Sequence, residues 1–137
     1  RLQEEDRVIE IRAYDTVYGV WKYFTVWEEQ MNLERESYCL IGTLEAWNAM
    51  CQYFGREKMI PVYIEVEDGT RLIRAVERER TQEHPGYEEL CRRFLADAKD
   101  FSEENLKNAG ITRRFENKDM NACLEEIKLF IQKAILI

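Results

Sequence analysis

The first third of the chain contains segments in which apolar and polar residues alternate. Residues 7–12 and 22–26 follow this pattern of period two, which is typical of β-strands with one face on a core. A third apolar segment, residues 37–42, ends in glycine and precedes Thr43, a residue type that often caps helices. The following residues predict a helix that runs to Phe54 and Gly55. A strand that leads into a helix indicates a parallel sheet.

The second half of the chain repeats the order of strand and helix. Residues 58–66 are almost continuously apolar, as expected of a strand covered by helices on both faces, and residues 68–82 have helical spacing. Further helices are predicted over residues 87–97 and 117–135, and another begins within residues 101–104 and ends at residues 109–110. A short strand is predicted over residues 111–115. The last helix has an apolar stripe at spacings of three and four that consists of Met120, Cys123, Leu124, Ile127, Phe130, Ile131 and Ile135.

This alternation predicts an α/β fold, a three-layer α/β/α arrangement around a parallel sheet. No repeat, linker or low-complexity segment interrupts the pattern, so we expect a single domain over residues 1–137.

The charge and the cysteines exclude several classes of function. A net charge of -7 argues against binding to DNA or RNA polymers, because that affinity comes mainly from neutralising backbone phosphates. The sequence has no signal peptide and no apolar run of membrane-spanning length, so we expect a cytoplasmic protein without membrane contact. The four cysteines are widely spaced on apolar faces and are interpreted as buried thiols. With His84 as the only histidine, a zinc site is not expected.

The predicted helices at residues 68–82 and 87–97 carry a concentration of arginines. Arg71, Arg74 and Arg78 recur at spacings of three and four, and the next helix carries Arg92 and Arg93. A guanidinium suits phosphate because its planar fork donates two parallel hydrogen bonds and stays charged. The alternative is a solvated face of salt bridges with neighbouring glutamates. Since adjacent helical residues point about 100° apart, we prefer Arg93 to Arg92 as a phosphate ligand.

These arginines are part of a wider resemblance. Leu72, Arg74, Arg78, Arg93 and Asp100, with residues 116–119 ahead of the last helix, resemble the second half of guanylate kinases and related nucleoside monophosphate kinases of the P-loop NTPase fold. The resemblance implies that residues 68–100 form a helical lid over ATP. It further implies that Arg74, Arg78 and Arg93 are catalytic and that Asn117 lies beside the adenine. Asn117 is equally suited to cap the last helix.

The same resemblance assigns residues 7–36 to a small β region that binds the acceptor nucleotide. Glu10, after Val8 and Ile9, matches a family glutamate that contacts GMP. The family's Tyr-Gly-Thr segment has two partial matches here, at residues 18–20 and 23–25, and Thr43 stands near the position of a guanine-reading aspartate. The implied substrate ligands are Glu10, Tyr18, Tyr23, Thr25 and Thr43. The tyrosines are also suited to packing.

The resemblance predicts transfer of the ATP γ-phosphoryl group to GMP or a similar nucleoside monophosphate. The sequence contains no glycine-rich loop followed by Lys and Ser or Thr, so we expect that loop upstream of Arg1, and Mg²⁺ with it. The alternative is a catalytically inactive guanylate-kinase-like module that binds a protein. A homodimer is a further open alternative.

Overall fold

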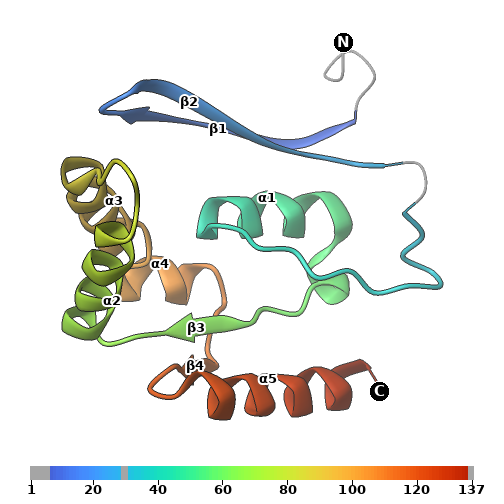
Figure 1. Cartoon of the computed structure of the whole chain (residues 1–137). Helices are drawn as coiled ribbons and strands as arrows, with labels where there is room; N and C mark the ends of the chain where they lie inside the picture. Colours follow the sequence, from blue (N-terminus) through green and yellow to red (C-terminus); the bar gives the residue numbers. More distant parts are fainter. Residues whose placement is uncertain (1–6, 29–30, 136–137) are drawn as a thin grey trace. The chain divides into compact units, whose positions relative to one another are not determined.

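A computed structural model describes residues 7–28 and 31–135 (Figure 1). The chain divides into two compact units, residues 1–59 and residues 60–137. Unit 1 contains strands β1 (Val8–Thr16) and β2 (Gly19–Val26), helix α1 (Leu44–Phe54) and the short 3₁₀ turn η1 (Arg56–Lys58). Unit 2 contains β3 (Tyr63–Glu65), α2 (Asp68–Arg80), α3 (Tyr87–Asp100), α4 (Glu103–Asn108), β4 (Arg114–Glu116) and α5 (Met120–Ile135).

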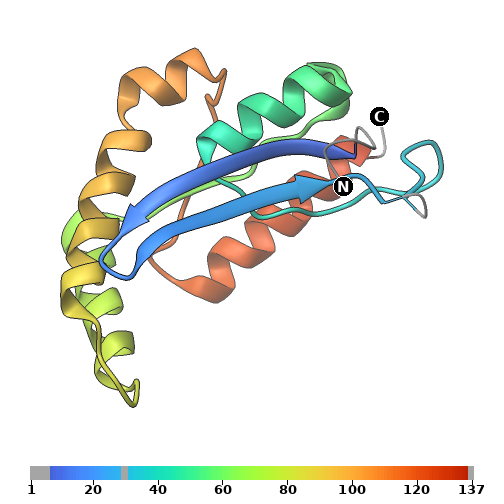
Figure 2. The ribbon, with the colours of Figure 1, turned by 90° about the horizontal axis from the view of Figure 1, so that it is seen from above.

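In unit 1, β1 and β2 form an antiparallel hairpin (Figure 2). The turn depends on Gly19, whose φ of 107° lies in the region that favours glycine. Strand pairing sets Glu10 opposite Thr25 and Arg12 opposite Tyr23. Because side chains alternate along a strand, these four residues share one face of the hairpin. That face carries the polar groups of the candidate site.

Helix α1 begins as its sequence predicts. The hydroxyl of Thr43 accepts a hydrogen bond from the backbone N–H of Ala46, which satisfies one of the free donors of the first turn. Gly55 ends the helix with a φ of 92°. Leu44, Ala46 and Met50 are the buried residues of α1.

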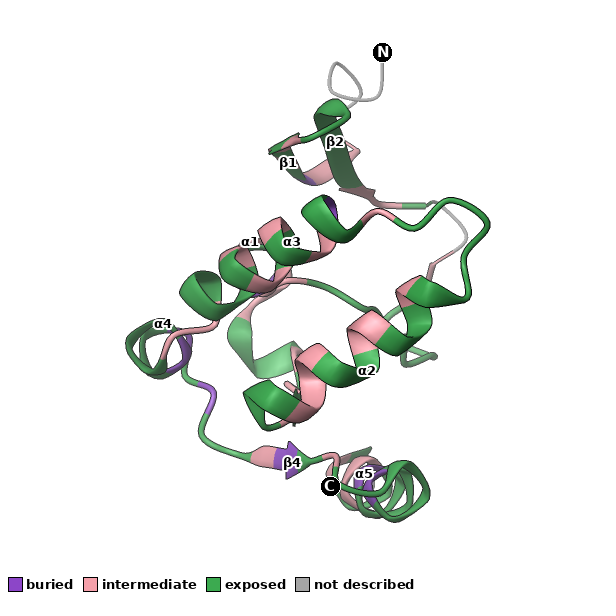
Figure 3. Ribbon diagram, turned by 60° about the vertical axis from the view of Figure 1, so that its left-hand side comes forward, coloured by how far each residue is buried: buried purple, intermediate pink, exposed green. Residues whose placement is uncertain are grey.

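In unit 2, the core lies where β4 meets α5. Phe115 on β4 is fully buried and packs with Cys123 and Ile127 of α5, while Val62 and Phe130 close the cluster at its edge. Figure 3 shows buried positions on α4, β4 and α5. Strand β4 pairs in parallel with β3, and the backbone N–H of Asn117 extends this pairing to Glu65. These contacts join the two ends of unit 2.

Arg71 joins helices α2 and α3 through two contacts. The guanidinium of Arg71 lies 4.2 Å from the ring centre of Phe94 and 3.8 Å from the carboxylate of Asp97.

At the start of α2, Glu67 accepts hydrogen bonds from the backbone N–H groups of Gly69 and Thr70. These bonds lower the pKa of Glu67.

The predicted three-layer α/β/α fold of a P-loop kinase is wrong. The described residues form a two-stranded antiparallel sheet and a separate two-stranded parallel sheet, with five α-helices. The apolar segment 37–42 forms no strand, and only residues 63–65 of the long apolar run 58–66 do so. Ile64 is 50% exposed, so helices do not cover both faces of β3. Apolar composition identifies residues that favour burial, but strand formation also needs a partner strand.

The helix predictions are confirmed, as are the two N-terminal strands, which run further than predicted. The prediction of buried thiols is confirmed for Cys123 alone, because Cys39 and Cys91 are exposed and Cys51 is half-buried. Within the part of the chain that the structure describes, no helix has the length and apolar character needed to cross a membrane.

The burial of Phe115 leads to a prediction about stability. The substitution Phe115→Ala removes the centre of the core of unit 2 and should lower the free energy of unfolding by about 3 kcal/mol. Urea unfolding followed by circular dichroism measures this loss. Leu129→Ala, on an exposed side of α5, is the matched control and should cost less than about 1 kcal/mol. Equal losses in the two variants would contradict this assignment of the core.

The hydrogen bonds of Glu67 at the start of α2 predict that the stability of the protein depends on pH. Because folding lowers the pKa of Glu67 from its ordinary value of 4.5, its contribution to stability is complete above that pH. The contribution is lost as the pH falls through the lowered value. Glu67→Gln should therefore lower the thermal midpoint at pH 7 and flatten its decline between about pH 5 and pH 2. Glu77→Gln, a substitution in the middle of α2, is the control and should alter neither the thermal midpoint at pH 7 nor its decline at lower pH.

Candidate functional site

A cluster of polar side chains on unit 1 brings together residues from three segments. We call it the hairpin cluster and define it as Glu10, Arg12, Tyr14, Thr25 and Thr43. Arg12 donates from Nε to Glu10 Oε2 at 2.8 Å and from Nη2 to Glu10 Oε1 at 3.2 Å. The hydroxyl of Thr25 donates to Glu10 Oε1 at 2.7 Å. The carboxylate of Glu10 is therefore held by both strands of the hairpin.

Arg12 also connects the hairpin to the start of α1. Its Nη1 donates to Thr43 Oγ1 at 2.7 Å and, at 3.4 Å, to the hydroxyl oxygen of Tyr14. Thr43 Oγ1 accepts from the N–H of Ala46 as well, so both of its lone pairs are used. The Thr43 hydroxyl proton remains able to donate to a ligand.

The hairpin cluster is electrically balanced and poorly accessible to solvent. Glu10 is one of only two buried charged residues in the described part of the chain, and the Arg12 side chain is 12% exposed. Burial by itself lowers the pKa of Arg12, but hydrogen bonds to Glu10 and Tyr14 outweigh this effect and raise it. Arg12 and Glu10 thus form a buried ion pair in which each charge lies beside an opposite one.

Aromatic side chains extend the same face of the hairpin toward its turn. The rings of Tyr14 and Tyr23 meet edge to face with their centres 5.8 Å apart. Tyr18, at the turn, stacks on Trp21 at 6.4 Å and is 66% exposed. Tyr18 thus lies outside the hairpin cluster, whereas Tyr23 touches it through Tyr14. Aromatic faces beside hydroxyl and guanidinium groups are suited to a nucleobase with a phosphate.

In unit 2, the structure brings together two more predicted site residues, Arg74 and Asn117. Arg74 donates from Nη1 to the backbone oxygen of Asn117 at 3.0 Å and from Nη2 to that of Lys118 at 3.1 Å. The side-chain oxygen of Asn117 is buried and lacks a hydrogen-bond partner among the described residues. Asn117 does not cap α5, since Asp119 accepts from the N–H of Ala122. Arg74 therefore orders the turn that precedes α5.

The other predicted arginines lie in different surroundings. Arg93 of α3 donates from Nε to Glu89 at 3.2 Å, and Arg92 donates to the same carboxylate from Nε and Nη2. Although they lie about 100° apart on the helix, both side chains therefore reach one point. Arg78 is exposed and has no side-chain partner among the residues that the structure describes. Its guanidinium is available to an anion.

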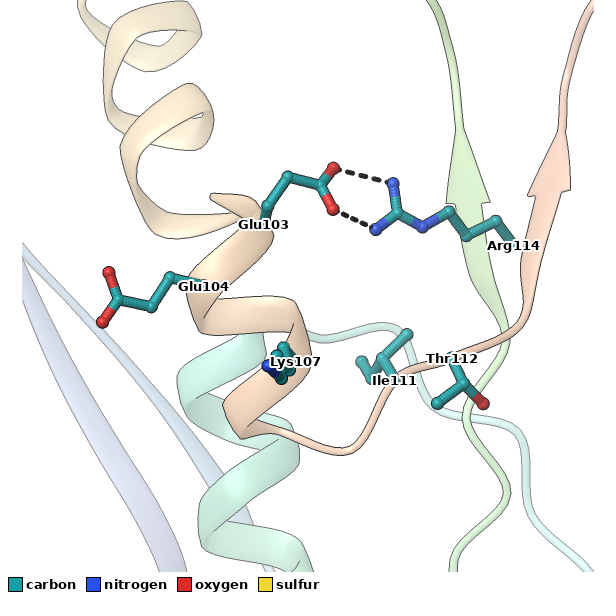
Figure 4. A pocket seen from close by; sticks show the side chains of 6 residues that line it. All are labelled: Glu103, Glu104, Lys107, Ile111, Thr112 and Arg114. Atoms are coloured by element: carbon teal, nitrogen blue, oxygen red, sulfur yellow. Dashed lines mark hydrogen bonds and ion pairs between the residues drawn. The ribbon is translucent and has the colours of Figure 1, made fainter.

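An open groove of about 550 Å³ lies beside α4 in unit 2 (Figure 4). In Figure 4 the guanidinium of Arg114 faces both carboxylate oxygens of Glu103. Arg114 also donates from Nη1 to Glu65 at 2.7 Å. These bonds raise the pKa of Arg114. The groove contains none of the residues that the sequence predicted, and its arginine is already paired with Glu65 and Glu103. The lining residues are Glu103, Glu104, Lys107, Ile111, Thr112 and Arg114.

The sequence analysis missed the residue at the centre of the hairpin cluster, Arg12. A signal for it exists, because Glu10 and Arg12 have opposite charges two positions apart on a predicted strand, and such residues share a face. Glu89 was also missed, although it precedes Arg92 and Arg93 by three and four positions, the spacing of ion pairs on a helix.

Comparison with known proteins adds no family. The sequence matches no protein-family model, and neither curated proteins nor solved structures yield a significant match. Over residues 7–28 and 31–135, no group of three or more His, Cys, Asp or Glu side chains is placed to hold a metal ion. These residues therefore offer no ligand set for the expected Mg²⁺.

The geometry of the hairpin cluster predicts a strong effect of truncating Arg12. Arg12→Ala leaves Glu10 without its main partner and should lower the free energy of unfolding by about 2 kcal/mol. Glu10→Gln in the same chain removes the unpaired charge and should recover part of this loss. Urea unfolding of the wild type, both single variants and the double variant measures the coupling. Strictly additive losses would contradict a direct interaction.

Proposed function

We propose that this chain is nucleotide kinase-like and takes part in transfer of the ATP γ-phosphoryl group to GMP or a similar nucleoside monophosphate. Unit 1 binds the acceptor nucleotide, and unit 2 supplies arginines to the ATP phosphates. This assignment agrees with the resemblance to guanylate kinases at residues 74, 78, 93 and 117. The comparisons with known proteins neither support nor oppose it.

The observation that carries the proposal is the convergence of three predicted acceptor ligands. Glu10, Thr25 and Thr43 come from separate segments. Arg12 hydrogen-bonds to Glu10 and to Thr43, and Thr25 hydrogen-bonds to Glu10. The cluster retains donors that a monophosphate needs, because the Thr43 hydroxyl and the Tyr14 hydroxyl can each donate. Tyr23 stands beside it with an aromatic face for a base.

In unit 2, the support comes from guanidinium groups that are not fully used. Arg78 has no side-chain partner among the described residues, and Arg93 is bonded through Nε alone. Arg74 uses two N–H groups on backbone oxygens, so its contribution is to order the turn at Asn117. Arginines act in phosphoryl transfer by neutralising charge on the moving group, and not by covalent chemistry.

In the proposed reaction, the bond from the γ-phosphorus to the bridging oxygen of ATP breaks, and ADP keeps that oxygen. A bond forms from the same phosphorus to a phosphate oxygen of the acceptor. The proposal assigns no Mg²⁺ ligand among the described residues, in which no group of three or more His, Cys, Asp or Glu side chains is placed to hold a metal ion.

The proposal predicts that the chain binds GMP through unit 1. In isothermal titration calorimetry, GMP should bind the wild type, and Tyr14→Phe, which removes a hydroxyl that can donate to the monophosphate, should weaken binding about three- to tenfold, the effect of one lost hydrogen bond. The Tyr14 ring keeps its contact with Tyr23 in this variant. Tyr53→Phe, on α1, is the matched control and should leave the affinity unchanged. If the folded wild type does not bind GMP at millimolar concentration, acceptor binding is refuted.

A protein-binding module without catalysis is the second candidate. The observation that favours it is the engagement of Arg74 with backbone oxygens and of Arg93 with Glu89, which makes both residues part of the structure of unit 2. This reading predicts that Arg78→Ala and Arg93→Ala leave ATP binding unaltered. The kinase proposal predicts that each of these substitutions weakens it.

A further inference from the structure

Helix α3 contains a buried carboxylate that no predicted role explains. Glu89 is the only buried charged residue in the described part of unit 2. It accepts three N–H groups: Oε2 accepts from Arg92 Nε at 2.9 Å, and Oε1 accepts from Arg92 Nη2 at 2.7 Å and from Arg93 Nε at 3.2 Å. A carboxylate bound in this way has a fixed position, because a bidentate pair restrains its rotation.

The charges of this group favour Arg93 as the residue that binds an anion. Arg92 directs the Nε and Nη2 edge of its guanidinium to Glu89, so these two charges cancel at close range. Arg93 adds one further positive charge, which leaves the group of three with a net charge of +1. Burial raises the pKa of Asp97, and Arg92 and Arg93 lie close enough to oppose this rise, so this carboxylate balances part of the positive charge. The exposed edge of Arg93 remains the part of the group that a phosphate can reach.

The bond from Arg93 Nε to Glu89 leaves the edge of the guanidinium that carries the two Nη atoms without a partner among the described residues. A guanidinium can bind two oxygens either through Nε and one Nη or through both Nη atoms. Glu89 takes Nε, and neither Nη atom of Arg93 has a hydrogen-bond partner among the described residues. The side chain is 57% exposed, so this edge faces solvent. It has the two parallel donors that a terminal phosphate requires.

We propose that Glu89 is a positioning residue that orients Arg93 so that its two Nη atoms face a phosphate of the bound nucleotide. This inference rests on the proposed function. An exposed arginine otherwise samples many rotamers, and fixing them on binding costs affinity. The Nε bond to an already fixed carboxylate imposes this order before the ligand arrives.

Two effects of Glu89 oppose each other, and a pair of substitutions separates them. Its negative charge repels an anion, whereas its Oε1 orders Arg93. Glu89→Gln removes the charge but keeps an Oε1 that can accept from both arginines. Glu89→Met, of similar size and helix propensity, removes the charge and the acceptor together. Both variants are uncharged, and they differ in the side-chain amide, whose oxygen can accept from Arg93.

The test uses the 137-residue chain and inorganic pyrophosphate in isothermal titration calorimetry. We expect Glu89→Gln to bind pyrophosphate at least as tightly as the wild type, and Glu89→Met to bind at least threefold more weakly than Glu89→Gln. Arg93→Ala should weaken binding at least tenfold. Glu88→Gln, which removes a charge at the adjacent position, controls for the general change in charge and should not weaken binding. Circular dichroism verifies that each variant is folded.

A second measurement needs no variant. In the wild type, the Arg93 Nε–H should exchange with water more slowly in nitrogen-resolved NMR spectra than the Nε–H of Arg78, which has no described partner. Equal exchange rates, or equal affinities of Glu89→Gln and Glu89→Met, would overturn the positioning role. If the wild type does not bind pyrophosphate, the phosphate-binding part of the proposed function fails, whatever the exchange rates. Binding that is insensitive to Arg93→Ala would overturn the role of Arg93.

Discussion

The guanidinium of Arg12 is the contact on which unit 1 depends. A two-stranded hairpin alone is marginally stable in water, and α1 contributes only three buried side chains to unit 1. Arg12 binds Glu10 with one edge and Thr43 with its remaining nitrogen, so it joins the hairpin to the residue that starts the helix. Polar contacts thus provide an attachment that a larger apolar core supplies in other small folds.

Arginines have a similar structural part in unit 2. Arg71 joins α2 to α3, Arg74 holds the turn before α5, and Arg114 binds Glu65 of β3 and Glu103 of α4. The planar fork that suits phosphate also suits carboxylates and carbonyl oxygens. A helical pattern of arginines therefore does not by itself show how many of them a ligand can reach. In this chain, structural contacts occupy most of those that the spacing identified.

The sequence predicted elements whose determinants are local. Thr43 and Gly55 mark the two ends of α1, and the spacing of apolar residues identified α5. The sheets were predicted poorly, because a strand needs hydrogen-bond partners that lie far away in the sequence. Residues 37–42 have the composition of a strand but no such partner among the described residues. For the candidate site, residue types predicted Glu10 and Thr43, yet only the paired strands and the start of α1 reveal Arg12 between them.

The hydrogen bonds that are already made decide what each cluster can bind. In the hairpin cluster, the Glu10–Arg12 pair has no net charge, so its remaining hydroxyl donors must recognise a ligand by geometry. On α3, Arg92 and Arg93 both pair with Glu89, and the Arg93 side chain is 57% exposed. In the function that we propose, the first surface selects a nucleotide by its shape and hydrogen bonds, and the second binds a phosphate through the exposed edge of Arg93. This division of roles follows from the pairing of the charges, and not from their number.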